Sequence, residues 1–268
     1  MRCAVVGHIE WVDFLRVDRV PDPGEIVTAR DGWSQAAGGG AVAALEFVRL
    51  GAETTFFTAV GSDELGRRAE RQLRERGLRL EVVTREAPQR RGFTFLDAEG
   101  ERTITVLGEK LVPHGEDPLA WAELTNAEAV YFCGGDPGAL EKAGAKPHAL
   151  VATARELPTL KTARFELGAL VHSARDSSER YTPGDLAPPP RLVATTEGAA
   201  GGRYTADGLE GRWAAAPLPG PRIDVYGAGD CFAAGLAFAL GSGASPQAAV
   251  EQGAASAASA LTRRGAGS

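Results

Sequence analysis

Short apolar runs that alternate with helical segments constrain the fold of this chain more than any other feature. These runs are residues 3–7, 54–61, 129–135, 148–154, 168–173 and 191–198. Apolar runs without polar alternation are typical of strands buried on both faces of a parallel sheet. Between them, segments that begin at Ala41, Asp63 and Asp117 have the apolar spacing of helices. This order predicts an α/β fold with a mainly parallel central sheet flanked by helices.

Two segments depart from that rhythm. Residues 90–108 have the alternation of two strands joined by a turn, and residues 14–35 are extended with a turn rich in proline and glycine. We expect strands inserted at about residues 12–36 and 90–108 to form a small β lid over the central sheet. An ordinary edge hairpin is the alternative. The whole chain, residues 1–268, is then a single α/β domain.

Composition and charge exclude several classes of protein. A net charge of −6 argues against general nucleic-acid binding, which depends on lysine and arginine. No window approaches the ~20 apolar residues that cross a bilayer. The first ten residues lack the apolar core of a signal peptide. Three scattered cysteines without a CxxC pair indicate a reducing compartment. We therefore expect a cytoplasmic protein with no nucleic-acid or membrane partner.

The stretch "DVYGAGDCFAAG", residues 224–235, combines a glycine-rich turn with the start of a helix near Ala228. Free backbone N–H groups at such a helix start bind anions, and glycine lets a ligand approach closely. Asp230 falls in the first turn. It is either an ordinary helix-start aspartate, or a base that takes the proton of an attacking hydroxyl while the N–H groups hold a phosphoryl group.

The same stretch resembles the C-terminal signature of the ribokinase-like (PfkB-type) carbohydrate kinases, Asp-Thr-x-Gly-Ala-Gly-Asp-x-Phe-x-x-Gly. Residues 37–66, "AGGGAVAALEFVRLGAETTFFTAVGSDELG", are similar to the family's N-terminal signature. The order and spacing of the two signatures agree with the family, and the hairpin lies between them. The resemblance covers essentially the whole chain. It implies a ribokinase-like three-layer sandwich with a small β lid.

The resemblance also implies a function and a set of site residues. The function is an ATP-dependent, Mg²⁺-requiring phosphotransferase that moves the γ-phosphate to a hydroxyl of a small sugar-like or nucleoside-like substrate. Asp230 would be the general base, and the backbone N–H groups of Gly227, Ala228 and Gly229 would form the anion hole. The implied nucleotide-binding residues are Thr196, Gly198 and Gly201, and the implied lining of the sugar pocket is Gly38 and Gly39. The family's habit of pairing lids implies a homodimer.

The chain departs from the family on the substrate side. Val42 stands where the family has a sugar-binding Asn, and the family's substrate-binding Asp falls near Val12. Glu10 and Asp13 lie close by in the sequence as stand-ins. We therefore expect Glu10, Asp13 and Val42 to belong to the substrate site. The loss of two polar anchors argues against a standard ribose or fructose substrate.

Further departures concern the nucleotide and its ions. The family's Asn-x-x-Glu motif becomes Ser173-Ala174-Arg175-Asp176, in which Asp176 is either a Mg²⁺ contact through water or a helix-start aspartate. Tyr226 replaces a Thr that helps hold a monovalent cation, which argues against potassium activation. Near Gly253 or Ala254 the family's adenine-side Asn becomes small, so the nucleotide preference stays open.

Two other functions compete with the kinase hypothesis. A non-catalytic member of the same fold, which binds a nucleotide or sugar, would explain the altered motifs but not the intact Gly-Ala-Gly-Asp. A dinucleotide-binding Rossmann protein is suggested by G-x-G-x-x-A at Gly38, Gly40 and Ala43, with Asp63 as the ribose-binding acid. That fingerprint needs a strand directly before it, and residues 31–37 have a polar, turn-like composition. Arg102, in the hairpin, is either solvated or able to reach a charged substrate.

Overall fold

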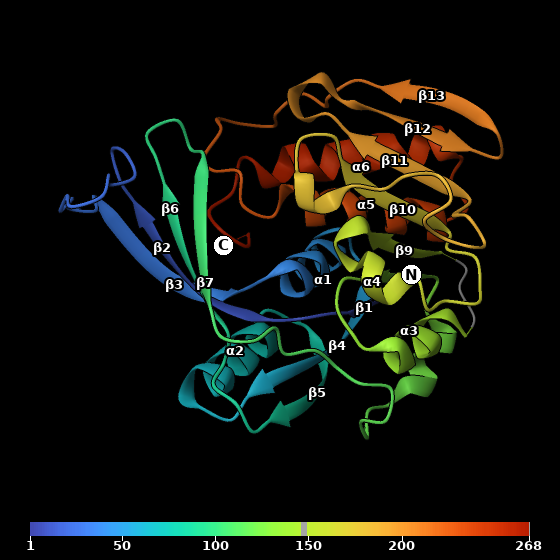
Figure 1. The fold of residues 1–268 in the computed structure, drawn as a ribbon, viewed down its shortest axis with the longest axis horizontal. Coiled ribbons are helices and arrows are strands. Elements are labelled where there is room, and N and C mark those ends of the chain that lie inside the picture. The colour runs from blue at the N-terminus through green and yellow to red at the C-terminus, as the bar shows by residue number, and fades with distance from the viewer. Residues whose placement is uncertain (146–148, 268) are drawn as a thin grey trace.

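A nine-stranded sheet forms the centre of the computed structural model, which describes residues 1–145 and 149–267 (Figure 1). The strand order is β13-β12-β11-β10-β9-β8-β1-β4-β5. All neighbours pair in parallel except β11 with β12 and β12 with β13. The strands are β1 Arg2–Val6, β4 Glu53–Gly61, β5 Arg79–Arg85, β8 Ala129–Phe132, β9 Leu150–Thr153, β10 Ala169–Ser173, β11 Leu192–Thr196, β12 Gly202–Ala206 and β13 Leu209–Trp213. The mainly parallel sheet is confirmed.

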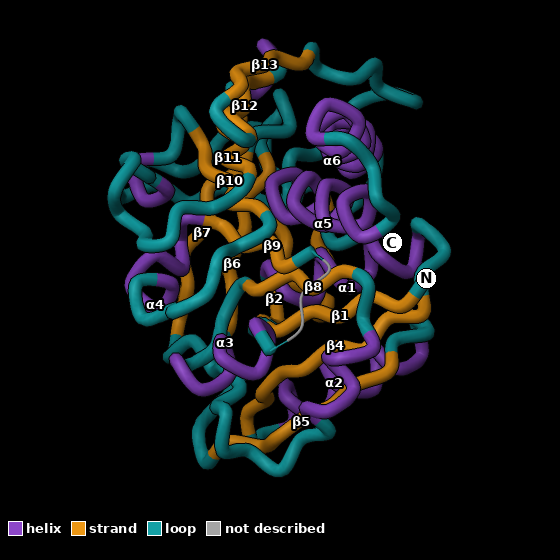
Figure 2. The backbone as a smooth tube through the Cα atoms, turned by 90° about the vertical axis from the view of Figure 1, so that its right-hand side faces the viewer, coloured by secondary structure: helices purple, strands orange, loops and turns teal. Residues whose placement is uncertain are grey.

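Helices cover both faces of this sheet, which confirms the expected three-layer sandwich. One apolar core lies under α1, α2, α5 and α6, and a second lies under α3 and α4. Figure 2 shows α5 and α6 on one side of the sheet and α3 and α4 on the other. The helices are α1 Gly39–Arg49, α2 Glu64–Glu75, α3 Pro137–Gly144, α4 Leu157–Leu160, α5 Ala228–Gly241 and α6 Pro246–Ala260. In the described part of the chain, no helix is long and apolar enough to cross a membrane.

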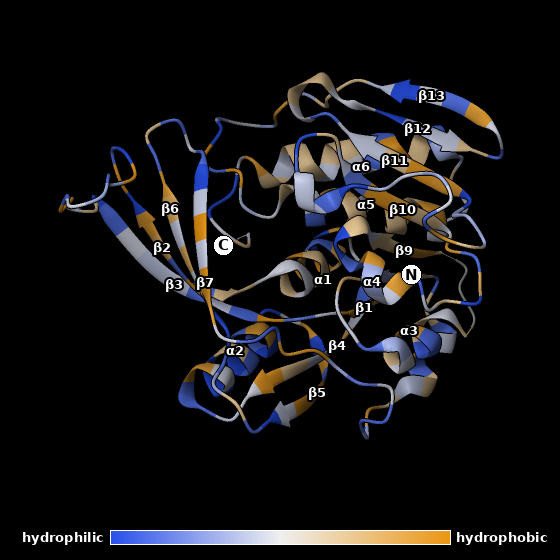
Figure 3. Cartoon of the chain, in the orientation of Figure 1, coloured by the Kyte–Doolittle hydropathy of each residue, from blue (hydrophilic) through white to orange (hydrophobic). Residues whose placement is uncertain are grey.

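The two cores explain why the strands are continuous apolar runs. Val5 faces the first core and Val6 faces the second, and both are fully buried. Successive side chains of a strand point to opposite faces, so a strand covered on both sides has no solvent-facing positions. The antiparallel edge strand β13 is more polar, as its blue colour in Figure 3 shows. The β12–β13 hairpin was not predicted from the sequence.

A second sheet of four strands, in the order β3-β2-β6-β7, stands beside the first. Its strands are β2 Glu10–Arg16, β3 Asp31–Ala37, β6 Arg91–Leu96 and β7 Arg102–Leu107. This is the small β sheet expected as a lid. Residues 31–37, taken from their polar composition as turn-like, are a strand. They pair with β2 instead of the parallel sheet, so the Rossmann arrangement is absent there.

The structure corrects one expected helix and shortens one expected strand. The segment from Asp117 forms only a 3₁₀ helix, η1 Trp121–Asn126. The Asp117 carboxylate, which could cap a helix, is instead bound by Arg85 at 2.6 and 2.8 Å and by the His114 N–H at 2.6 Å. In the run 148–154, strand β9 begins at Leu150, and His148 lies outside the described residues.

Candidate active site

The glycine-rich turn places open N–H groups at the start of α5. Gly227 is left-handed, with φ 74°, and α5 begins at Ala228. A β carbon on Gly227 would lie 2.7 Å from Cγ1 of Val42, so only glycine suits this position. Within residues 1–145 and 149–267, no protein group accepts a hydrogen bond from the backbone N–H of Gly227, Ala228 or Gly229. With the positive end of the helix dipole, these groups can hold an anion.

Asp230 lies in the first turn of α5 but does not cap that helix, which has no side-chain cap hydrogen bond. Its Oδ1 accepts a hydrogen bond of 3.0 Å from the Tyr131 hydroxyl on β8. A β carbon on Gly39 would lie 2.8 Å from the same oxygen. The carboxylate is therefore enclosed by α5, by β8 and by the start of α1.

Opposing effects act on the pKa of Asp230. Burial raises this pKa above its ordinary value because desolvation penalises the charged carboxylate. The positive charge of Arg155 lowers it, followed by the Tyr131 hydrogen bond and the charges of Arg102 and Lys110. The net shift is upward. Such a group is a better proton acceptor than an exposed aspartate.

Glu10 and the Gly38-Gly39 turn lie close to Asp230. A β carbon on Gly38 would lie 3.0 Å from the Glu10 amide nitrogen and 3.3 Å from Cδ2 of His8. The Glu10 carboxylate forms an ion pair of 2.8 Å with Arg90, and burial raises the pKa of Glu10. The negative charge of Asp230 adds to this rise, so the two carboxylates act on each other.

A buried tyrosine ties this turn to the anion-binding loop. The Gly38 N–H donates to the Tyr226 hydroxyl at 3.1 Å. The Tyr226 N–H donates to the buried Asp224 carboxylate at 2.8 Å, and the N–H of Gly265 donates to the same carboxylate at 2.9 Å. Tyr226 therefore acts as a strut between two turns that are far apart in sequence.

The structure separates the other predicted substrate residues. Val42 is buried behind Gly227. Asp13 lies on the opposite face of β2 from Glu10, where it pairs with Arg91 at 2.8 Å and accepts a hydrogen bond from Ser34. Glu10, Gly38 and Gly39 are thus brought to Asp230, and Asp13 is not.

The predicted nucleotide residues lie at the carboxyl end of β11. Thr196 is the last residue of β11 and pairs with Ser173 of β10. After it, the Gly201 N–H donates to the Gly198 carbonyl at 3.0 Å, and both glycines have positive φ. Asp176 follows Ser173 on the neighbouring loop. The carboxyl ends of parallel strands are the usual place for ligands in such sheets.

Asp176 fits a Mg²⁺ ion only as an outer contact. Its carboxylate accepts from the Ser178 N–H at 2.9 Å and from Arg155 Nη2 at 2.7 Å. Hydrogen bonds from Ser178 lower the pKa of Asp176 and keep it ionised. Among the described residues, no group of three or more His, Cys, Asp or Glu side chains could hold a metal. One carboxylate suits Mg²⁺ that keeps its waters and binds substrate phosphates.

Several charged side chains at the site were missed or undervalued from the sequence. Arg155 pairs with Asp176 and with Glu179. Lys110 donates to the Cys133 carbonyl at 3.1 Å and also pairs with Glu156. Arg155 follows β9 directly, so its place at the carboxyl end of a predicted strand was the available signal. Lys110 lies in an irregular segment and carried no such signal.

The tip of the β6–β7 hairpin contacts the segment that leads to the anion-binding turn. Arg102 Nη1 donates to the Val225 carbonyl at 2.8 Å, and Glu101 pairs with Arg222 at 2.5 Å. Arg102 is therefore anchored across the site and is not simply a solvated strand residue. The tip of the small sheet thus contacts the segment before α5, as a lid over this region would.

A four-stranded sheet beside an α/β sandwich, with a carboxylate next to a helix N-terminus, is the arrangement expected of a ribokinase-like carbohydrate kinase. The chain belongs to the PfkB family of carbohydrate kinases, since the model of the pfkB carbohydrate kinase family matches residues 1–157 and 136–268.

Individual relatives agree with this family. An ATP-dependent ribose-1-phosphate kinase of Halopiger xanaduensis is 26% identical over 134 residues, which are 49% of this chain and 45% of that protein. The matched segment thus spans less than half of that curated relative. The crystal structure of a putative ribokinase from Agrobacterium tumefaciens has a TM-score of 0.80 at 22% identity, covering 99% of this chain and 92% of the other. Arabidopsis thaliana ribokinase complexed with ribose and ATP has a TM-score of 0.73 at 19% identity, covering 98% and 93%.

Proposed function

We propose that this protein is an ATP-dependent phosphotransferase that moves the γ-phosphate to a hydroxyl of a small sugar-like or nucleoside-like acceptor. The observation that carries the proposal is the half-buried Asp230 carboxylate beside the open N–H groups of Gly227, Ala228 and Gly229. Membership of the PfkB family supports it. The choice of ATP is supported by the similarity to an ATP-dependent ribose-1-phosphate kinase and to a ribokinase whose structure contains ATP.

Each part of the site has a task in this reaction. Asp230 accepts the proton of the acceptor hydroxyl as its oxygen attacks the γ-phosphorus. The N–H groups of residues 227–229 hold the charge on the transferring phosphoryl group. Thr196, Gly198 and Gly201 line the nucleotide. The lid excludes water, which would otherwise compete as an acceptor.

A Mg²⁺ ion would be held by the nucleotide phosphates and, through water, by Asp176. When bound, it neutralises charge on the β- and γ-phosphates. The Arg155 guanidinium, 2.7 Å from Asp176, adds a fixed positive charge between that carboxylate and Asp230. This fixed charge stabilises the phosphates without needing to reorganise.

The acceptor lies between Asp230 and Glu10 in this proposal. Glu10 supplies a hydrogen-bond acceptor for a second hydroxyl, and its ion pair with Arg90 holds it in place. The family's Asp and Asn anchors are absent, because Val12 and Val42 occupy those positions. We therefore expect an acceptor other than ribose or fructose.

We also propose a homodimer formed through the lids. Every residue of β7 is exposed, including the apolar Ile104, Val106 and Leu107. An exposed edge strand with apolar side chains is a surface suited to pairing with a second copy. Analytical ultracentrifugation tests this, and a monomer at all concentrations would contradict it.

The cysteines bear on the compartment. Cys3, Cys133 and Cys231 are free and buried. Unpaired thiols are typical of reducing compartments, and we propose the cytoplasm.

An ADP-release screen with MgATP tests the function. Pentoses, hexoses, sugar acids, polyols and nucleosides are offered as acceptors to the full chain and to Asp230→Asn. We expect ADP release with at least one acceptor class, and its loss in the variant. A uniformly blank screen with ATP binding intact would instead support a non-catalytic binding protein.

A further inference from the structure

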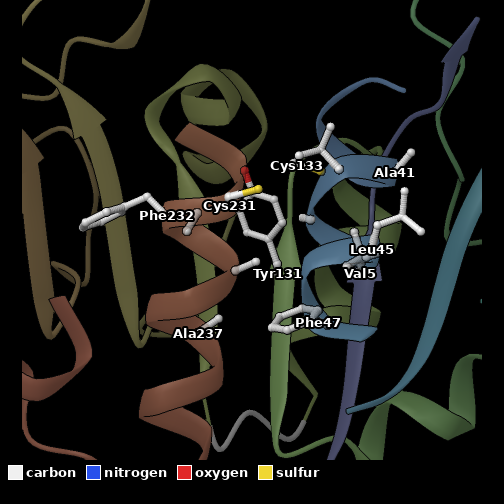
Figure 4. Close-up of a cluster of buried hydrophobic side chains, with 14 of the residues drawn as sticks. Val5, Ala41, Leu45, Phe47, Tyr131, Cys133, Cys231, Phe232 and Ala237 are labelled. Carbon is white, nitrogen blue, oxygen red and sulfur yellow. The ribbon is translucent and has the colours of Figure 1, made fainter. Parts of the chain in front are cut away.

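Tyr131 connects the middle of the central sheet to the base at its edge. It lies on β8, in register with Val5 of β1 and Val151 of β9, and its side chain is fully buried. Figure 4 shows its ring beside Cys231, at the first turn of α5. Its hydroxyl reaches Oδ1 of Asp230 at 3.0 Å. A rigid strand thus carries the partner of a helix-borne carboxylate.

The direction of this hydrogen bond follows from the chemistry of the two groups. Burial raises the pKa of Tyr131 well above its ordinary value, and the nearby negative charge of Asp230 raises it further. The phenol therefore keeps its proton at any physiological pH. An ionised carboxylate has no proton to give, so the tyrosine hydroxyl is the donor.

The two oxygens of Asp230 have different surroundings. Oδ1 accepts the hydrogen bond of the Tyr131 hydroxyl. A β carbon on Gly39 would lie 2.8 Å from Oδ1 and 3.5 Å from Oδ2, so the Gly39 position is close to both oxygens. No donor among the described residues reaches Oδ2. A hydrogen bond to one oxygen alone restricts the rotation of the carboxylate and leaves the other oxygen available.

Given the proposed role of Asp230 as base, we propose that Tyr131 is a positioning residue that holds Oδ1 so that Oδ2 faces the acceptor hydroxyl. In the reaction the acceptor O–H bond breaks and its proton passes to Oδ2. The acceptor oxygen forms a bond to the γ-phosphorus, and the bond from that phosphorus to the bridging β–γ oxygen breaks. ADP leaves with that electron pair, and Tyr131 keeps its own proton throughout.

Other charged and titratable groups also act on Asp230, and the test has to separate Tyr131 from them. Arg155, Arg102 and Lys110 are cationic and favour its ionised form. Glu10 and Glu179 are acidic neighbours. The remaining groups that face it are Tyr226, Cys133 and Cys231. Replacing Tyr131 by Phe changes none of these charges and keeps the ring.

The proposal is tested by carbon NMR of the full chain labelled with [4-¹³C]aspartate, in the apo form. The Asp230 carboxyl signal is assigned by its loss in Asp230→Asn. In Tyr131→Phe, we expect the Asp230 titration midpoint to rise by about one pH unit, a tenfold change in proton affinity, because the ionised form loses a donor. Tyr204→Phe, on the distant β12, is the matched control and leaves the midpoint unchanged.

A second arm keeps the test valid if Tyr131→Phe fails to fold. Fluorotyrosine at position 131 retains the ring and the hydroxyl but is a stronger donor, so the Asp230 midpoint should fall. Midpoints that move in neither variant would overturn the positioning role and leave the proposed function standing. Conversely, phosphate transfer that survives in Asp230→Asn would overturn Asp230 as base, whatever the NMR result.

Discussion

The two halves of the site are built from different chemical groups. The phosphate half uses backbone N–H groups at the start of α5, on a turn that keeps the family's Gly-Ala-Gly-Asp. The proposed acceptor half uses side chains, and there Val42 stands where the family has a polar anchor, while a second anchor of the family falls near Val12. A backbone donor cannot be removed by substituting the side chain that it carries. In the proposed function, this difference preserves the groups that transfer the phosphate and changes the groups that would recognise the acceptor.

The Glu10 side chain of the proposed acceptor half is also held by another side chain. Glu10 pairs with Arg90 at 2.8 Å. A buried charge needs such a partner, because an unpaired one costs about 3–5 kcal/mol. In the proposed function, the acceptor would meet a charge that is already paired, whereas the transferring phosphate would meet open donors.

The largest expected effect comes from the phosphate half, in Asp230→Asn. Removal of a general base lowers kcat by about 10²–10⁴. We expect ATP binding to be retained, since the N–H groups of residues 227–229 are untouched. Steady-state kinetics and calorimetric titration with ATP measure the two quantities. An Asp230→Asn protein with nearly full kcat would show that Asp230 is not the general base, and the two halves would then not differ in this way.

The pH dependence of the wild-type enzyme has a definite sign. Burial raises the pKa of Asp230, and the base works only when ionised. Activity therefore falls as the pH drops through that raised pKa, so the acidic limb lies above the pKa of about 4 of an exposed aspartate. The pH profile of kcat/KM measures it, because that ratio reports the ionisation of the free enzyme. A limb at or below that value would indicate a different base.

Gly227→Ala tests the turn itself. A non-glycine residue at φ 74° costs about 1–2 kcal/mol, and the new β carbon would meet Val42 at 2.7 Å. We expect the free energy of unfolding to fall by at least about that amount. Denaturant unfolding measures it. Gly243→Ala is a matched control, with φ 81° and open space around its β carbon, and should show only the backbone cost.

In the acceptor half, Glu10→Gln should weaken binding of the acceptor more than it slows transfer. Loss of one charged hydrogen bond raises KM for the acceptor about tenfold, equivalent to about 1.4 kcal/mol. Asp13→Asn, on the other face of the same strand, is the control and should leave KM unchanged. Equal effects of the two substitutions would show that the faces of β2 do not differ in function.

The smallest effect is expected from Arg102→Ala. Its hydrogen bond to the Val225 carbonyl is exposed, so its loss costs no more than about 1 kcal/mol, or roughly fivefold. We expect the ratio of ATP hydrolysis to phosphate transfer to rise, because a looser lid admits water. Coupled assays of ADP and of phosphorylated acceptor give this ratio. A lower ratio in the variant would contradict the covering role of the lid.

The sequence predicted the sandwich because burial on both faces leaves a plain signal in strands such as β1 and β4. It placed extended structure at residues 12–36, as found, but the turn-like composition assigned to residues 31–37 was wrong, because a strand with exposed positions needs no apolar run. The motif located Asp230 and its helix start. It did not reveal Tyr131 or Arg155 as partners, because their proximity to Asp230 depends on the register and the loops of neighbouring strands. The residue pattern of one strand does not say which residues of the neighbouring strands will lie beside it.

The Tyr226 strut has a consequence for regioselectivity. Tyr226 joins the Gly38 turn to the Gly227–Gly229 turn, so in the proposed function it would fix the distance between the transferring phosphoryl group and the Gly38 side of the acceptor. Of the hydroxyls of a polyol, only the one that this distance brings to the phosphate would then react. We expect a single phosphorylated regioisomer from any acceptor, seen as one phosphomonoester signal in the ³¹P spectrum. Substitution of acceptor-side residues would change which molecule binds. The hydroxyl that reacts would still depend on the distance that Tyr226 fixes between the two turns.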